Sequence, residues 1–215
     1  MRRFNKICLL LGLALVVSPL FVAAAQAPEG SSVEFRNRFI QNFDRSGMDT
    51  TPSDAMMLRI LVESRNAKRG VEVGSFHGFG AINMGIGFER TGGHLYTLEL
   101  DSSRAEQVRE NLKKVGLEKT VTCIRGDARK TLAKLEGKFD FVFLDAAKDQ
   151  YFDYLKLIEP KLAPGAVVVA DNVIKLARPM QDFLDYIQHS PNYETVIIRA
   201  SLEKHDGMLI AYKLR

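Results

Sequence analysis

Polar and apolar residues alternate in blocks along most of this chain, and the blocks predict strands and helices in turn. Short, nearly continuous apolar runs predict five strands, at residues 70–73, 94–98, 121–124, 139–144 and 166–170. Apolar residues at helical spacing predict helices at 81–88, 101–115, 128–135, 151–162 and 179–188. Regular alternation of this kind is typical of a doubly wound α/β sheet.

The two ends of the alternating region differ from its middle. Thr51-Pro52-Ser53-Asp54 predicts a helix start, with a capping hydroxyl, a proline in the first turn and an early acid. Pro164-Gly165 is expected to stop the helix that begins at Tyr151. Residues 195–198 and 208–212 predict two closing strands with no helix between them. We therefore expect a hairpin-like antiparallel ending on an otherwise parallel sheet.

The first 27 residues have the layout of a secretory signal. Arg2, Arg3 and Lys6 precede an apolar run over 7–25, and small residues follow at its end. We predict export, with 28–47 as a tether and short helix and 48–215 as the folded domain. The alternative is an uncleaved membrane anchor, because the run is about long enough to span a bilayer.

Charge and cysteine content exclude some classes of protein. The formal net charge is +4, but three of the 30 basic and none of the 26 acidic residues lie in the first 27, which leaves +1. This small value gives no reason to expect nucleic-acid binding. Of the two cysteines only Cys123 follows the predicted signal, so no internal disulfide is expected.

The candidate chemistry lies where the predicted strands end. Gly74 follows the first strand, Glu99 the second, Asp145 the fourth and Asp171 the fifth. The carboxyl ends of parallel strands meet at one edge of the sheet, where doubly wound sheets bind their ligands. The four positions together therefore predict one site more strongly than any single motif.

The run Val71-Glu-Val-Gly-Ser-Phe-His-Gly-Phe-Gly80 predicts a glycine-rich turn whose backbone N–H groups approach a ligand. Short-chain nicotinamide-dependent reductases share this spacing, but they need a tyrosine four residues before a lysine, and none of the six tyrosines has one. Glu72 lies inside an apolar strand and needs a partner, either an N–H group of the turn or a ligand's ammonium group. Glu99 is placed to accept two ribose hydroxyls, with a solvated strand-end acid as the alternative.

Polar residues after the later strands suggest an oxygen-rich site. Asp145, Asp171 and Asn172 offer three oxygens from two strand ends, which suits a hard cation such as Mg²⁺; a simple Asp-Asn turn is the alternative. Lys148 lies three residues after Asp145, where a nearby cation would lower its pKa and let it take a proton from a hydroxyl. The alternative is an ordinary surface lysine. Asp127 fits a helix N-cap, a place beside an adenine, or both.

These residues resemble the motifs of a known family. The segments are Glu72-Val-Gly74-x-x-x-Gly78, Glu99, Asp145-Ala-Ala-Lys148-Asp-x-Tyr151, Ala-Asp171-Asn172-Val and Asp206-Gly207. They are similar to the cation-dependent O-methyltransferases, which include catechol and caffeoyl-CoA O-methyltransferases, from about Met48 to the C-terminus. The resemblance implies a Rossmann-like class I methyltransferase fold with seven strands, mostly parallel and the last antiparallel. It also implies S-adenosylmethionine as methyl donor.

The resemblance further implies roles for individual residues. Glu99 would hold the ribose hydroxyls, and Asp127 and Ala128 would lie beside the adenine. The methionine part of the donor would meet Met48 and the turn, which comprises Glu72, Gly74, Phe76, Gly78 and Gly80. Asp145, Asp171 and Asn172 would bind a divalent cation, Mg²⁺ before Mn²⁺ or Ca²⁺, with Asp145 also near the donor's amino group. Lys148 would be the general base for a catechol-like or other vicinal-diol aromatic acceptor. Dimers are common in the family, so a homodimer is a further expectation.

The chain also departs from that family. Ala147 stands where catechol O-methyltransferase carries a tryptophan, and Gly80 replaces a common serine. No acid aligns with that enzyme's substrate-binding glutamate, so the acceptor is not determined. An exported scaffold that keeps the fold without activity is the competing hypothesis, because the donor is made in the cytoplasm. The intact metal and base residues argue against it.

Overall fold

A computed structural model describes residues 29–215 of the 215-residue chain. The predicted signal, 1–27, lies outside the described residues, so export and its alternative, the membrane anchor, stay predictions. Across the described part, none of the helices combines the length and apolar character needed to cross a bilayer.

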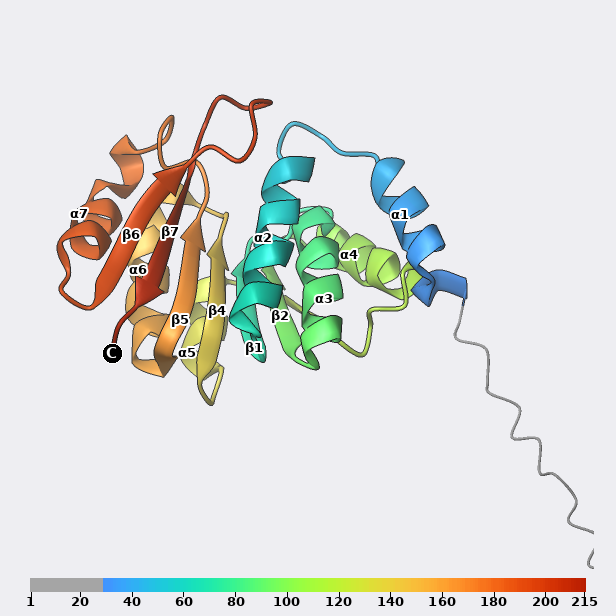
Figure 1. Ribbon diagram of the computed structural model, residues 1–215, viewed down its shortest axis with the longest axis horizontal. Helices are drawn as coiled ribbons and strands as arrows, with labels where there is room; N and C mark the ends of the chain where they lie inside the picture. The colour runs from blue at the N-terminus through green and yellow to red at the C-terminus, as the bar shows by residue number, and fades with distance from the viewer. Residues whose placement is uncertain (1–28) are drawn as a thin grey trace, which may run out of the picture.

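The described residues form a seven-stranded sheet in the order β3-β2-β1-β4-β5-β7-β6 (Figure 1). The strands are β1 Arg69–Val73, β2 His94–Glu99, β3 Val121–Arg125, β4 Phe139–Leu144, β5 Leu162–Ala170, β6 Tyr193–Ile198 and β7 Met208–Lys213. β1 to β5 pair in parallel, whereas β7 pairs antiparallel with both β5 and β6. β7 alone therefore opposes the other strands, which confirms the predicted mostly parallel sheet with its last strand antiparallel.

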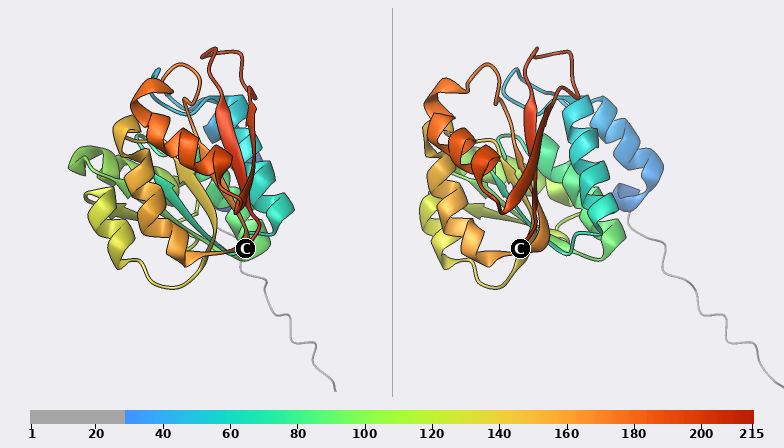
Figure 2. Two further views of the ribbon diagram at one scale, coloured as in Figure 1. Left: turned by 90° about the vertical axis from the view of Figure 1, so that its left-hand side faces the viewer. Right: turned by 60° about the vertical axis from the view of Figure 1, so that its left-hand side comes forward.

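Helices cover both faces of this sheet (Figures 1 and 2). The α-helices are α1 Val33–Gln41, α2 Pro52–Arg65, α3 Phe79–Thr91, α4 Ser102–Lys114, α5 Ala128–Lys134, α6 Tyr151–Ile158 and α7 Gln181–His189. Four 3₁₀ turns accompany them: η1 Glu29–Ser31, η2 Lys148–Gln150, η3 Glu159–Lys161 and η4 Arg178–Met180. Buried side chains of α2, α3 and α4 share one core with β4 and β5, and those of α5, α6 and α7 share the core on the opposite face.

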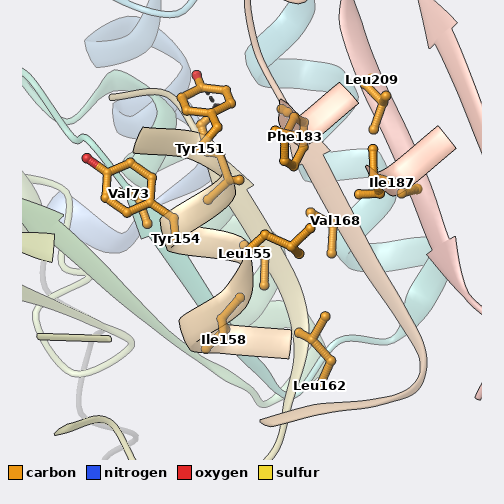
Figure 3. Packing of buried hydrophobic residues seen from close by; sticks show 14 of the residues in the cluster. Val73, Tyr151, Tyr154, Leu155, Ile158, Leu162, Val168, Phe183, Ile187 and Leu209 are labelled. Atoms are coloured by element: carbon orange, nitrogen blue, oxygen red, sulfur yellow. Dashed lines mark hydrogen bonds between the residues drawn. The ribbon is translucent and has the colours of Figure 1, made fainter. Parts of the chain in front are cut away.

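The core under α6 shows how one helix face is held on the sheet (Figure 3). Tyr151, Leu155 and Ile158 of α6 share a buried cluster with Val168 of β5, and the rings of Tyr151 and Phe183 meet edge to face at 5.6 Å between centroids. All five side chains are buried. Truncating a leucine such as Leu155 to alanine in a core of this kind costs about 2–5 kcal/mol. This packing fixes the start of α6, which borders the candidate site.

The structure confirms the predicted start of α2 and corrects the end of α6. Thr51 is the N-cap, and its hydroxyl accepts a hydrogen bond from the backbone of Asp54 at 3.3 Å. The helix from Tyr151 was predicted to reach residue 162, but α6 ends at Ile158 because Pro160 cannot continue an α-helix. β5 likewise begins at Leu162, not 166, and a register shift between 162 and 167 accommodates Pro164 and Gly165 in the strand.

α1 is held against the end of α3 by a largely buried arginine. Arg36 is 6% exposed; its Nη2 donates to Glu89 Oε1 at 3.0 Å and its Nε to the Val115 carbonyl oxygen at 2.8 Å. The segment after α1 then crosses toward α2 and brings Met48 to the carboxyl edge of the sheet.

Candidate functional site

A cavity of about 540 Å³ opens at the carboxyl ends of the parallel strands. It lies where a doubly wound sheet binds ligands, because the loops after β1, β2, β3 and β4 all contribute to its wall. Nine of the predicted site residues line it: Met48, Gly74, Phe76, Glu99, Asp127, Ala128, Asp145, Lys148 and Asn172. The structure thus brings together residues that are up to 124 positions apart in the chain.

Gly74 opens the turn after β1 in a conformation that other residues rarely adopt. Its φ is +95°, and a Cβ there would collide with the carbonyl oxygen of Asp145. Phe76 follows with φ 52°, also left-handed. The turn therefore approaches the loop after β4 as closely as the backbone allows. It lies between the part of the cavity beside β1 and β2 and the part beside β4 and β5.

Glu99 is fixed at the end of β2 by two backbone donors. Its Oε2 accepts from the N–H of Phe76 at 2.8 Å, and its Oε1 accepts from the N–H of Asp101 at 3.0 Å. The residue is only 7% exposed but lines the cavity. Each carboxylate oxygen keeps a second lone pair, so both can accept a ligand hydroxyl from the cavity.

Asp127 caps α5 and lines the cavity at the same time, so both predicted roles are open to it. Its carboxylate accepts from the backbone N–H of Arg129 at 2.9 Å, and this hydrogen bond lowers the pKa of Asp127. Ala128 follows as the first residue of α5. An adenine ring bound here would lie over the small side chain of Ala128 and the neighbouring backbone.

Glu72, Gly78 and Gly80 lie behind the turn, outside the cavity wall. Glu72 is 1% exposed and accepts a hydrogen bond from the Thr97 hydroxyl, a partner that sequence reasoning did not name. Burial raises its pKa to about 8. A Cβ on Gly80 would lie 2.7 Å from Glu72 Oε1 and 3.2 Å from Thr50 Oγ1, so a serine here would require the Glu72 side chain to move. These three residues shape the turn, and a direct contact with the donor stays a prediction.

Asp145 and Asp171 follow neighbouring strands, β4 and β5, and are both largely buried. Burial raises the pKa of Asp145, although Lys148 partly offsets this effect. Burial, followed by the negative charge of Asp145, raises the pKa of Asp171 to about 7. Two neighbouring, largely buried carboxyl groups whose pKa values are raised form an arrangement that a bound cation would stabilise.

Asn172 completes the group of oxygen donors and lines the cavity. It has φ 63°, and its backbone N–H donates to Asp171 Oδ1 at 2.7 Å. Residues 29–215 contain no cluster of three or more His, Cys, Asp or Glu side chains that could hold a metal. The candidate set therefore consists of two acids and one carboxamide, which fits a hard cation that keeps further positions for water or substrate.

Lys148 stands between Asp145 and the start of α6. Its Nζ donates to Asp145 Oδ1 and to the Tyr151 hydroxyl, each at 2.8 Å. The Tyr151 hydroxyl in turn donates to the Leu144 carbonyl oxygen at 2.9 Å. Because Tyr151 is buried in the core, this chain of contacts fixes the lysine at the cavity wall.

Sequence reasoning did not identify several cations in the cavity wall, among them Arg104 and Lys204. Arg104 stacks over the ring of Phe76 at 4.4 Å, and Lys204 donates from Nζ to the Asp49 carbonyl oxygen at 2.7 Å. Both lie in segments whose sequence is typical of a solvated helix start and a solvated loop. Only the folded arrangement of the loops places them at the site.

The comparisons with known proteins agree with this geometry. A family model described as O-methyltransferase matches residues 27–184. The chain belongs to the O-methyltransferase family. That membership confirms the resemblance noted from the motifs.

Three similar proteins illustrate the family. O-methyltransferase ankF of Aspergillus thermomutatus is 30% identical over 140 residues, which cover 64% of this chain and 59% of that protein. Catechol O-methyltransferase of Niastella koreensis is 32% identical over 132 residues, 60% of this chain and 59% of that protein. The solved O-methyltransferase of Bacillus cereus, in complex with SAH, superposes with a TM-score of 0.74 over 90% of this chain and 95% of that one, at 23% identity, and shows the shared fold. The aligned part of the chain thus spans less than two thirds of the two curated relatives.

Proposed function

We propose that this chain transfers a methyl group from S-adenosylmethionine to a hydroxyl of a catechol-like or other vicinal-diol aromatic, with the help of a divalent cation. The observation that carries the proposal is the pair of buried carboxyl groups, Asp145 and Asp171, whose pKa values are raised at the ends of β4 and β5. Asp145 lines a cavity that also holds Glu99, and Asp171 is buried directly before Asn172, which lines the same cavity. A site that merely closed a turn would not need two acids in such a costly place.

The donor fits the half of the cavity beside β1 and β2. Glu99 offers one free lone pair on each oxygen to the ribose hydroxyls. Asp127 and Ala128 form the wall for the adenine, and Gly74 leaves room for the methionine part. The donor supplies a methyl group on a positively charged sulfur. Family membership and the relatives' names support this assignment.

The cation would be held by Asp145, Asp171 and Asn172 at the other half of the cavity. A bound divalent cation stabilises the ionised form of an aromatic hydroxyl that it contacts. The name of the Niastella koreensis relative, a catechol O-methyltransferase, supports an acceptor with two adjacent hydroxyls. Ala147 lines the cavity beside Lys148, so a small side chain faces the acceptor.

Lys148 is the residue placed to accept the hydroxyl proton. The acceptor oxygen forms a bond to the methyl carbon, the carbon–sulfur bond breaks, and its electron pair stays on sulfur. The proton of the hydroxyl would pass to Lys148 Nζ after that nitrogen has released its own proton, a release that a divalent cation held at Asp145 would favour by charge repulsion. Tyr151 holds that nitrogen at the cavity wall, which fixes its distance to the acceptor.

The direct test is a methyl-transfer assay on residues 28–215, with S-adenosylmethionine and a panel of catechols and matched monohydroxy aromatics. We expect methylated catechols in the presence of Mg²⁺, no product in chelator, and little product from the monohydroxy compounds. Donor binding should be measured on the same protein by calorimetry. An absence of donor binding with and without Mg²⁺ would instead favour the scaffold hypothesis.

A further inference from the structure

Asp206 joins the loop before β7 to the loop after β5. It is 8% exposed, and its Oδ1 accepts from three backbone N–H groups, those of Ile174 and Lys175 at 3.0 Å and that of Gly207 at 2.8 Å. The backbone N–H of Val173 also donates to the Gly207 carbonyl oxygen at 3.0 Å. One carboxylate oxygen is thus committed to shaping the segment that follows Asn172.

The other oxygen of Asp206 faces the side chain of Asn172. Asn172 Nδ2 lies 3.4 Å from Asp206 Oδ2. A carboxylate oxygen accepts hydrogen bonds and cannot donate them, so only the NH₂ end of the amide is stable on that side. The carbonyl oxygen of Asn172 must then lie at the opposite end, and no group within residues 29–215 is bonded to it.

We propose that Asp206 is a positioning residue that orients the Asn172 amide so that its oxygen, not its nitrogen, is presented to the divalent cation. The inference rests on the proposed function, because it assumes that Asn172 is a ligand. An amide oxygen binds a hard cation and an amide NH₂ does not, so the orientation decides whether the site has two or three protein ligands. Partners of ligands that act in this way tune metal affinity in other sites.

The substitution Asp206→Asn changes the orientation of the Asn172 amide while it keeps the hydrogen bonds that shape the loop after Asn172. The new amide keeps its oxygen on the three backbone N–H groups, because the reverse placement would lose all three hydrogen bonds. Its NH₂ group then faces Asn172 Nδ2, and two donors repel each other. Asn172 must rotate its amide, which turns the NH₂ end toward the cation site.

The double substitution Asn172→Asp with Asp206→Asn restores a donor–acceptor pair between the two side chains. The carboxylate introduced at position 172 accepts from the NH₂ group introduced at position 206 through one oxygen, and it offers the other oxygen to the cation. Asp153→Asn provides a matched control, because it removes one negative charge from the exposed face of α6.

The experiment measures Mn²⁺ binding by the loss of its free spin-resonance signal, without donor or acceptor. We expect Asp206→Asn to bind about tenfold or more weakly, the double variant to recover to within about threefold of the unsubstituted protein, and Asp153→Asn to be unchanged. Donor affinity and the unfolding midpoint of metal-free Asp206→Asn should stay near those of the unsubstituted protein.

Three results would count against the proposal, and they differ. Unchanged Mn²⁺ affinity in Asp206→Asn overturns the positioning role and leaves the proposed function standing. Strictly additive effects of the two substitutions, judged with Asn172→Asp alone, assign the recovery to added charge and also overturn it. No Mn²⁺ binding by the unsubstituted protein overturns the cation dependence itself and the inference with it.

Discussion

The cavity has two halves that treat their acidic side chains differently. Beside β1 and β2, Glu99 accepts a backbone N–H hydrogen bond on each of its carboxylate oxygens. Beside β4 and β5, Asp145 and Asp171 lie near each other, and burial, followed by the charge of Asp145, raises the pKa of Asp171. Asp171 is buried and Asp145 largely so, and the pKa of each is raised. The acid of the first half is therefore hydrogen-bonded by the polypeptide itself, whereas in the second half Lys148 offsets the charge of Asp145 only in part.

The difference teaches what each half contributes. A preorganised acceptor of hydroxyls gives affinity and orientation without rearrangement. Two largely buried carboxyl groups lower the stability of the fold when they ionise, and a bound cation would offset that cost. Substitutions in the two halves should therefore change different quantities, and each prediction below tests that separation.

The largest effect is expected from Asp171→Ala. It removes one of two acids from the cation side, so turnover should fall by about 10³-fold and chelator should have no further effect. Donor affinity, which depends on the other half, should stay within about threefold of that of the unsubstituted protein. Turnover with and without chelator and donor calorimetry provide the check. Full activity in chelator would mean that the oxygen cluster is only a turn.

The next largest effect should appear in the free energy of unfolding and come from Glu72, a buried acid behind the turn after β1. Its pKa is raised to about 8 when folded, against 4.5 as the ordinary value, so the folded state binds more protons between these values. Stability contributed by this group is present at low pH and is lost as pH rises from about 4.5 through about 8. Glu72→Gln should remove up to about 4 kcal/mol of the stability difference between pH 5 and pH 9.

Denaturant unfolding at both pH values measures that difference. Glu106→Gln is a matched control, because Glu106 is exposed on α4. If Glu72→Gln keeps the full pH dependence, then Glu72 is ionised in the folded protein and contributes none of that dependence.

Lys148→Ala should lower turnover by about 10²-fold through loss of the proton acceptor. Donor affinity should hardly change, because Lys148 contacts the cation side of the cavity. Raising the pH should recover part of the turnover, since more of the acceptor is then ionised without help. Lys156→Ala on the exposed face of α6 serves as the control. Unchanged turnover would remove the general-base role.

The smallest effect is expected from Glu99→Gln. The amide keeps its shape but weakens hydrogen bonds to the ribose hydroxyls, and donor affinity should fall by about tenfold. Mn²⁺ affinity of the donor-free protein should be unchanged. A change in Mn²⁺ affinity would show that the two halves are coupled and would contradict the separation drawn above.

Sequence reasoning located most of the site because the signals were local. A glycine that must approach another strand's loop, or an acid that directly follows an apolar run, is visible without a fold. Gly74, Glu99 and Asp145 were found in this way. The end of α6 was missed because Pro160 lay within a run of otherwise helical spacing, and Pro164-Gly165 gave a stronger but later stop signal.

Other features had no local signal at all. Lys204 and Arg104 became part of the cavity wall only when distant loops met there. The partner of Glu72 is a hydroxyl on the neighbouring strand, because strand pairing places Thr97 opposite Glu72. Neither fact follows from spacing along the chain.

The sequence by itself determined the order of elements and many of the side chains that line the cavity, because strand periodicity and strand-end position depend on neighbours in the chain. The tertiary structure alone decided the electrostatics: which acids are stable as anions, and which are held at a cost. Ionisation depends on burial and on the distance to other charges, and those distances are set by segments that are far apart in sequence.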